Sequence, residues 1–315
     1  MNYNAGDWLA RSIASVAAQT ETDFECFIVD NDSKDESFAS LPELDGRFIL
    51  LPQNENTGFA KGNNIAARQA KGEWLALLNP DAFARRDWLE KIGETICAYP
   101  KATMIGSTQY MALEPNVFDG LGDEYHAFGL AWRSGFNHPV TPVRDREAYG
   151  PCGAGAVYHR EVYMRLGGFD ESFFCYHEDV DLAFRMRLDG GFCVQSAGAK
   201  IDHISSGILG RSSEFAVYHG TRNRIWTFMK NMPLPLLLCL GPAHIVTNFV
   251  VLIWSLFRPG RLNPTFRGLR DGFFNRPKSE QPTAKMKISH LKLLRSFGWS
   301  PLKVLKRATV KTKNP

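Results

Sequence analysis

The sequence predicts an α/β fold with a mixed, mostly parallel sheet flanked by helices. Two observations carry this prediction: short apolar runs alternate with helical patterns, and each apolar run stops at a polar cluster. Alternating strands and helices are typical of parallel α/β sheets. Ligands of such sheets bind beyond the carboxyl ends of the strands. We therefore expect the polar clusters to meet at one edge of the sheet and to form the functional site.

Three β-rich apolar runs open the chain. They are FECFIVDN (24–31), RFILLPQN (47–54) and EWLALLNPDA (73–82). Helical patterns lie before, between and after them, over residues 7–20, 61–70 and 87–100. In the first pattern, apolar residues recur at i, i+4 and i+7 from Leu9, the spacing of one helix face. The polar clusters that follow the runs are Asp30-Asn31, Asn54 to Gly62 and Asn79-Pro80-Asp81.

The stretch CYHEDVDLAFRMRLDGG (175–191) places three carboxylates, Glu178, Asp179 and Asp181, at the start of a helical pattern. Apolar residues recur at i, i+4 and i+8 from Val180 and predict the buried face of that helix. A helix cap needs only one acid. Three acids therefore indicate a nearby cation or a proton to be removed, and a solvated helix start is the alternative.

The segments on either side of this helix are less regular. Residues 101–150 are rich in Gly, Pro and aromatic residues and predict irregular structure with short strands. Residues 150–174 predict a strand, a helix and a Gly-Gly break. Residues 191–207 predict a strand with His203 near its end. A lone histidine is more often structural than a ligand, so both interpretations of His203 stay open.

The net charge of +4 is unevenly distributed along the chain. From Arg258 to the end there are fifteen Lys or Arg and two acids, a local charge of +13, so the first 257 residues carry −9. This argues against a nucleic-acid-binding core and favours a basic tail that meets an anionic surface such as phospholipid head groups. The six cysteines are scattered without metal-finger spacing, which is typical of free thiols in a reducing cytoplasm.

The segment 234–257 holds 24 residues without a formal charge, enough to span a bilayer. Pro235 and the Gly241-Pro242 pair are expected to break such a helix. Both flanks are basic, which conflicts with a single crossing. We expect a broken pair of interfacial or re-entrant helices; a true membrane span and a buried core helix are the alternatives. The N-terminal residues lack the pattern of a secretory signal.

The order of these parts resembles glycosyltransferase family 2, the inverting, metal-dependent enzymes with the GT-A fold (Rossmann-like), and among them the rhamnosyltransferases. The resemblance covers residues 2–230. Five motifs carry it: NYNAGDWLARSIASVAAQT, FIVDNDSKDES, NENTGFAKGNN, LLNPDA and GGFDESFFCYHEDVDLAFRMRLDGG. Each motif alone is weak, but their order at strand ends makes the set specific. It implies a GT-A domain over 1–230, an apolar membrane-associated helical segment over 231–257 and a basic tail over 258–315.

The resemblance implies a site for a nucleotide-diphosphate sugar. Asp30 would accept a hydrogen bond from a pyrimidine base, with Tyr3 and Asn4 flanking that base; a turn or cap is the alternative role for Asp30. The other donor-binding residues that it implies are Asn56, Gly58, Phe59, Asn63, Asn79 and, in PCGAG near the sugar, Gly153. Arg211, Arg222 or Arg224 could neutralise phosphate.

NPD stands where the family carries its metal-binding D-x-D motif. A hard divalent cation that bridges two phosphates favours carboxylate oxygen. The resemblance therefore implies that Asp81 binds Mg²⁺ or Mn²⁺, that Asn79 serves the ribose or a metal-bound water, and that His203 can reach the metal or the diphosphate. An N-cap is the alternative role for Asp81.

The resemblance also implies the catalytic groups. Asp179 would be the base that removes the proton of an acceptor hydroxyl. Glu178 would orient Asp179 or the acceptor, and Asp170 would shape the acceptor pocket. The segment around TRNRIW lacks the Q-x-x-R-W pattern of processive relatives, so we expect one sugar to be added per encounter.

The chain departs from the family at its start, because relatives have an apolar strand before NYN and here Met1 precedes the motif directly. That strand is normally central, and its loss leaves ladder groups of its neighbours unpaired. We expect the true start to lie upstream. The alternative is a sheet that survives with a gap.

These inferences predict a glycosyltransferase that moves one sugar, L-rhamnose from dTDP-L-rhamnose, to a lipid-linked or cell-surface polysaccharide acceptor. We expect it in the cytoplasm, peripherally bound to the inner face of the cell membrane, with no nucleic-acid partner. UDP-hexose is the alternative donor. A nucleotidyltransferase or a non-catalytic nucleotide-binding protein is the alternative class.

Overall fold

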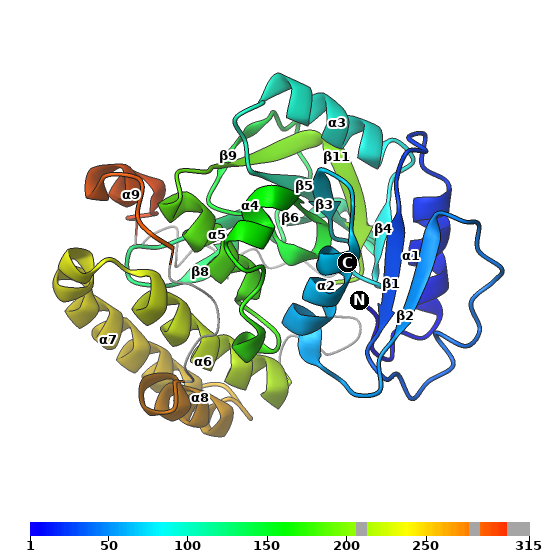
Figure 1. Cartoon of the computed structure of the whole chain (residues 1–315). Coiled ribbons are helices and arrows are strands. Elements are labelled where there is room, and N and C mark those ends of the chain that lie inside the picture. Colours follow the sequence, from blue (N-terminus) through cyan, green and yellow to red (C-terminus); the bar gives the residue numbers. More distant parts are fainter. Residues whose placement is uncertain (206–212, 277–283, 301–315) are drawn as a thin grey trace.

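The computed structural model describes residues 1–205, 213–276 and 284–300 (Figure 1). The helices are α1 (Asp7–Ala17), α2 (Gly58–Gln69), α3 (Trp88–Ala98), α4 (Arg160–Arg165), α5 (Glu178–Leu188), α6 (Glu214–Asn231), α7 (Leu234–Leu256), α8 (Leu262–Phe274) and α9 (His290–Ser296). The strands are β1 (Cys26–Asp30), β2 (Phe48–Pro52), β3 (Trp74–Ala76), β4 (Ala82–Ala84), β5 (Met104–Met111), β6 (Glu114–Gly120), β7 (Asp123–Tyr125), β8 (Ala131–Arg133), β9 (Arg146–Ala148), β10 (Ala156–His159) and β11 (Cys193–His203).

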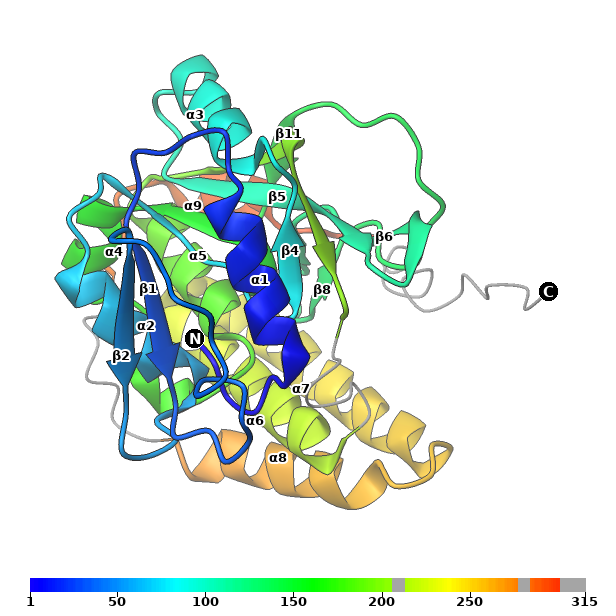
Figure 2. The same cartoon turned by 90° about the vertical axis from the view of Figure 1, so that its right-hand side faces the viewer.

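A mixed sheet lies at the centre of the fold. Its strand order is β3-β10-β5-β11-β4, with β6 paired to β5 and β9 paired to β11. The two long strands β5 and β11 pair in parallel, and the shorter strands pair antiparallel to their neighbours. β1 and β2 form a separate parallel pair, which lies beside α1 in Figure 2. The mixed α/β fold that the sequence predicts is confirmed.

Asn2 attaches the start of the chain to β1. Its backbone N–H donates to Val29 O at 2.7 Å, and Asn31 N–H donates to Asn2 O at 2.9 Å, so Asn2 forms a parallel bridge at the carboxyl end of β1. Among the described residues, β1 and β2 do not pair with the central sheet.

Helix α5 is buried on almost all sides, and a buried ionic network fixes it. The Asp181 carboxylate accepts hydrogen bonds from Arg185 Nε at 2.8 Å, Lys230 Nζ at 3.1 Å and Asn231 Nδ2 at 2.7 Å. Lys230 Nζ also donates to Asp170 Oδ2 at 2.6 Å. Two cations thus balance two carboxylates inside the core, and the network ties α5 to the end of α6.

Helix α7 runs unbroken from Leu234 to Leu256, so the expected break at Gly241-Pro242 is wrong. Pro235 lies in the first turn, where a backbone N–H has no helical acceptor. Pro242 lies inside the helix, where it removes one backbone hydrogen bond without ending the helix. α6, α7 and α8 lie together on one side of the molecule (Figures 1 and 2).

The described part of the expected basic tail is folded onto the rest of the protein. α8 packs on α6, and the segment 284–300 returns to the core. Leu293 and Phe297 are buried there, and Gly298 N–H donates to Tyr125 O at 2.7 Å. Residues 277–283 and 301–315 of that tail lie outside the described residues.

The buried network predicts a large loss of stability for Lys230→Met. This change leaves Asp170 and Asp181 with less positive charge in a buried site, which costs about 3–5 kcal/mol. Lys287→Met is the matched control, because Lys287 is 57% exposed in its pair with Asp189 and an exposed pair contributes at most about 1 kcal/mol. Urea unfolding gives both values. Equal losses in the two variants would contradict the role of the network.

Candidate active site

One cleft of about 790 Å³ brings most of the expected site residues together. Its walls come from the chain start, the loops before α2 and after β3, the segment 152–154, the start of α5 and the first turns of α6. The expected residues that line it are Tyr3, Asn56, Gly58, Phe59, Asn79, Asp81, Gly153, Glu178, Asp179 and His203. Asp81 and Asp179 thus face a common space.

A turn with unusual backbone geometry presents Asp179 to the cleft. Phe174, Tyr176 and His177 have positive φ angles of 64°, 70° and 69°, a conformation that costs energy for residues other than glycine. The buried Asn223 side chain of α6 compensates, because its amide lies within 2.7–3.0 Å of the carbonyl oxygens of three turn residues. α5 begins directly after this turn, so the turn sets the position of its first residues.

The Asp179 carboxylate is held by two backbone donors. Gly153 N–H donates to Oδ2 at 2.9 Å, and Val180 N–H donates to Oδ1 at 2.8 Å. Burial raises the pKa of Asp179 above its ordinary value, although these hydrogen bonds act in the opposite direction. A carboxylate with a raised pKa accepts a proton more readily at neutral pH, which is the property that a general base needs.

Two further carboxyl groups lie next to Asp179 in the cleft. Burial, followed by the negative charge of Asp179, raises the pKa of Glu178 well above its ordinary value. The same two causes raise the pKa of Asp123. Glu178 Oε2 is buried without a hydrogen-bond partner among the described residues. The cluster therefore favours the protonated form of at least one of its carboxyl groups.

Asp81 and His203 face each other where β4 and β11 pair. Asp81 Oδ1 lies 3.3 Å from His203 Nε2, and the register of β11 on β4 places His203 opposite Ala82. On its other side, His203 Nδ1 lies 2.7 Å from Asp119 Oδ2, and Asp119 is paired with Arg133. Burial lowers the pKa of His203, but the hydrogen bonds with Asp119 and Asp81 outweigh burial and raise it.

Asp81 and His203 suit a divalent cation. They offer a carboxylate oxygen and an imidazole nitrogen on the wall of the cleft, and Asp119 fixes the ring of His203 from behind. No group of three His, Cys, Asp or Glu side chains with metal-binding geometry occurs among residues 1–205, 213–276 and 284–300. Further ligands would therefore have to come from a bound diphosphate or from water.

The start of α2 contacts the turn before α5. Gly58 has φ +81°, and a Cβ atom there would lie 2.6 Å from both the ring and the carbonyl oxygen of Phe174. Asn56 Oδ1 accepts from Gly58 N–H at 3.0 Å and fixes the loop. Glycine at position 58 therefore permits the loop before α2 to touch the turn before α5.

Several expected residues do not line the cleft. The Asp30 carboxylate accepts from Asn2 Nδ2 at 2.8 Å and from Ser33 Oγ at 2.7 Å, and so anchors the chain start. Asn4 Oδ1 accepts from Lys34 N–H, and Asn63 Nδ2 donates to Phe59 O. Asp30 and Asn4 thus fix loops near the cleft, whereas the hydrogen bond of Asn63 lies within α2.

Asp170 requires a correction, because it is 2% exposed and lies in the ionic network with Lys230 rather than in an acceptor pocket. Arg222 donates to Phe173 O and Arg224 donates to Asn248 Oδ1, and neither lines the cleft. Arg211 lies outside the described residues.

The segment 119–133 brings residues to the site that the sequence patterns do not indicate. Asp123, Trp132 and Arg133 line the cleft, and Asp119 lies behind His203. No periodicity or motif singles out these positions. The aromatic residues Tyr176 and Phe215 also line the cleft, where α6 meets the turn before α5.

A family model described as glycosyl transferase family 2 matches residues 1–167. The O-antigen biosynthesis protein RfbC of Myxococcus xanthus is 29% identical over 218 residues, which are 64% of this chain but only 16% of that relative. The N-acetylglucosaminyl-diphospho-decaprenol L-rhamnosyltransferase of Mycobacterium tuberculosis is 24% identical over 247 residues, 70% of this chain and 80% of the relative.

Two solved structures share the fold. A mannosyltransferase from Pyrobaculum calidifontis, in complex with GDP-Man and Mn²⁺, has a TM-score of 0.55 at 16% identity and covers 88% of this chain and 86% of its own. GalNAc-T7 with UDP, GalNAc and Mn²⁺ has a TM-score of 0.58 at 16% identity and covers 72% of this chain and 46% of its own. The likeness shows a GT-A fold.

The contacts of His203 predict that Asp119→Asn lowers its pKa. The change removes a negative charge that stabilises the imidazolium. Burial, which disfavours the imidazolium, then has a larger net effect on the pKa. NMR titration of the metal-free protein measures the shift. Asp202→Asn is the matched control, because Asp202 lies next to His203 on β11 but pairs with Arg85. An unchanged His203 titration in Asp119→Asn would contradict the assignment.

Proposed function

This chain belongs to glycosyl transferase family 2, and on that premise we propose an inverting, metal-dependent enzyme that adds one L-rhamnose from dTDP-L-rhamnose to a lipid-linked saccharide. The observation that carries the proposal is the shared cleft of Asp81 and Asp179. It supports a site in which the diphosphate leaves on the side of Asp81 while a hydroxyl is activated on the side of Asp179.

Asp179 acts as the general base in this proposal. Its carboxylate takes the proton of the acceptor hydroxyl as the oxygen forms a bond to C1 of the donor sugar. The bond between C1 and the diphosphate oxygen breaks in the same step, and its electron pair leaves with the diphosphate. A single displacement of this kind inverts C1. The hydrogen bonds from Gly153 and Val180 hold the base in one orientation.

Asp81 and His203 would hold the divalent cation in this proposal. When bound, Mg²⁺ or Mn²⁺ supplies the positive charge that stabilises the departing diphosphate. Asn79, like Asp81, follows β3 and lines the cleft. In this proposal Asn79 would bind the ribose or a metal-bound water. Two structural neighbours were solved with Mn²⁺, which supports this choice of cation.

The loop before α2 and the chain start hold the nucleotide. Tyr3 offers an aromatic face for a base, and Asn56, Gly58 and Phe59 line the pocket beside it. Asp30 and Asn4 do not contact the nucleotide in this proposal. Their side chains fix the loop that carries Tyr3. Gly153 lies close to the donor sugar in this proposal, next to Asp179.

The sugar and the acceptor are proposed from the relatives. The mycobacterial relative is named as the L-rhamnosyltransferase of N-acetylglucosaminyl-diphospho-decaprenol, and the Myxococcus relative is named for O-antigen biosynthesis. UDP-hexose is the second candidate donor. A lipid-linked acceptor supports a peripheral location at the cytoplasmic face of the cell membrane. Each basic residue near an anionic surface contributes roughly 1 kcal/mol to such binding.

Asp179→Asn is expected to lower kcat about 10²–10⁴-fold, because the amide cannot accept the acceptor's proton. Release of dTDP from dTDP-L-rhamnose in the presence of acceptor measures turnover, and calorimetry measures donor binding, which should be unchanged. Asp189→Asn, at the other end of α5 and outside the cleft, is the matched control. Full turnover in Asp179→Asn would rule out this residue as the base.

Asp81→Asn is expected to abolish the effect of Mn²⁺ on donor affinity. In the parent protein, Mn²⁺ should tighten dTDP-L-rhamnose binding over that measured with a chelator. In the presence of Mn²⁺, the variant should bind dTDP-L-rhamnose at least about tenfold more weakly than the parent. Mutation of a residue that only supports a metal ligand already weakens metal binding by that factor. Asp87→Asn, on the N-cap of α3, is the control. An undiminished Mn²⁺ effect in Asp81→Asn would exclude a metal at this site.

A further inference from the structure

The polarity of α7 is the reverse of that of a helix on a water-soluble protein. Its polar residues His244, Asn248 and Ser255 are 2%, 2% and 3% exposed. Its large apolar residues point outward, with Leu238 70% and Phe249 61% exposed. α7 is the one helix among the described residues that is long and apolar enough to cross a membrane, yet only 17% of its most apolar window is buried. Its outer face therefore requires an apolar environment.

The polar face of α7 is docked along the length of the helix. The His244 ring stacks on Phe228 of α6 at 4.0 Å, and its Nδ1 lies 2.8 Å from Phe128 O. Asn248 Oδ1 accepts from Arg224 at 2.5 Å. Leu236 packs into the main core near the start of the helix. A helix that crosses a bilayer must be clear of the water-soluble domain over about 30 Å. α7 can therefore not cross a membrane while it keeps these contacts.

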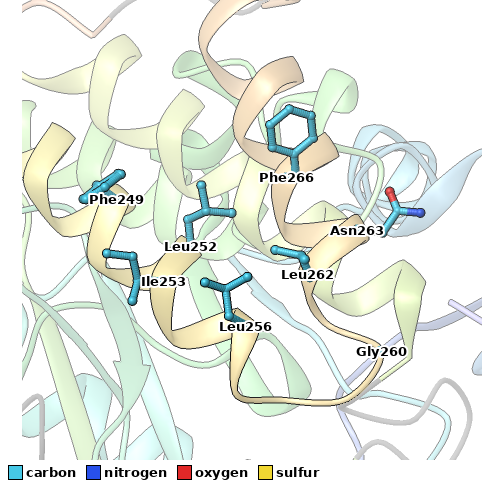
Figure 3. Close-up of a pocket in the computed structure, with 8 residues that line it drawn as sticks. All are labelled: Phe249, Leu252, Ile253, Leu256, Gly260, Leu262, Asn263 and Phe266. Carbon is cyan, nitrogen blue, oxygen red and sulfur yellow. The ribbon is translucent and has the colours of Figure 1, made fainter.

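α8 extends the apolar surface. Residues of α7 and α8 form a groove of about 690 Å³ between them (Figure 3). Phe249, Leu252, Ile253 and Leu256 line it from α7, and Leu262 and Phe266 line it from α8. The opposite face of α8 packs tightly on α6, because a Cβ atom at Gly268 would lie 2.8 Å from Tyr218 O. This packing keeps Leu262 and Phe266 pointing away from α6.

The charge of this region indicates which apolar environment it meets. From Arg258 to Phe274 there are four arginines and one acid. The guanidinium of Arg258 lies 4.5 Å over the ring of Trp254, which is 44% exposed. Tryptophan and arginine side by side are typical of the head-group level of a membrane.

We propose that the α7–α8 hairpin (residues 234–274) lies in the plane of an anionic phospholipid membrane, with its groove filled by acyl chains and its polar face docked on the catalytic domain. This inference deepens the proposed membrane location and rests on it, but it does not depend on the donor sugar. α6 lines the active-site cleft with Phe215 and Gly220 and carries α8 on another face. α6 and α8 thus separate the cleft from the lipid, a distance of about two helix diameters, or roughly 20 Å.

The first experiment measures binding to vesicles of phosphatidylcholine and phosphatidylglycerol in equal parts. The parent protein should bind them, and Phe249→Gln/Phe266→Gln should bind about a hundredfold more weakly, because two aromatic side chains leave the hydrocarbon. The matched control is Leu113→Gln, since Leu113 is 75% exposed on the turn between β5 and β6. Donor binding should be equal in all three proteins.

The second experiment distinguishes an in-plane helix from a spanning one. A fluorescent thiol probe is attached either to Cys239, in a Cys97→Ser variant, or to position 254, in a Trp254→Cys variant that also carries Cys97→Ser and Cys239→Ser. Spin-labelled lipid in the outer leaflet should quench both probes equally. In a spanning helix the two positions would differ in depth by about 22 Å, because a helix rises 1.5 Å per residue. Only one of the two probes would then be quenched.

Three results would overturn the proposal. These are no binding of the parent protein to the vesicles, quenching at only one of the two positions, and a stable dimer in solution that Phe249→Gln/Phe266→Gln dissociates. Asp179→Asn should bind the vesicles like the parent. A failure of catalysis and a failure of the membrane inference can therefore be told apart.

Discussion

The position of α5 depends on a charge balance inside the core. Asp181 receives hydrogen bonds from a cation of its own helix, Arg185, and from Lys230 at the end of α6. This balance lets a helix with an acidic start be buried on nearly all sides. The start of α5 is fixed in turn, and Asp179 and Glu178 line the cleft while Asp181 remains in the core. Of the three neighbouring acids, one serves the fold and two face the cleft.

Sequence patterns could predict the residues at the ends of regular elements. Asp81 follows β3, Asp179 lies in the first turn of α5 and His203 ends β11, and strand order brings such ends to one edge. Asp119 and Asp123 could not be found this way, because they lie on β6 and β7 in a region without clear periodicity. Asp170 was misassigned because its partner Lys230 lies 60 positions away in the chain, and spacing does not reveal that pairing.

α6 joins the parts of the molecule that a sequence treats as separate. Its first turns line the cleft, and Asn223 holds the strained turn before the proposed base. Its other faces carry α8 and the polar side of α7. The apolar segment that looked like an appendage in the sequence is therefore built on the same helix that shapes the active site.

The return of residues 284–298 to the core has a practical consequence for anyone preparing this enzyme. Phe297 packs between Tyr125, Tyr149 and Phe184, beyond the hydrophobic hairpin in the chain. A truncation that ends the chain before the hairpin, made to avoid the need for detergent, would also remove Phe297. The aromatic cluster of the core would then be exposed to water. Polar substitutions on the outer surface of the hairpin keep Phe297 in the core, and they offer the better route to crystals.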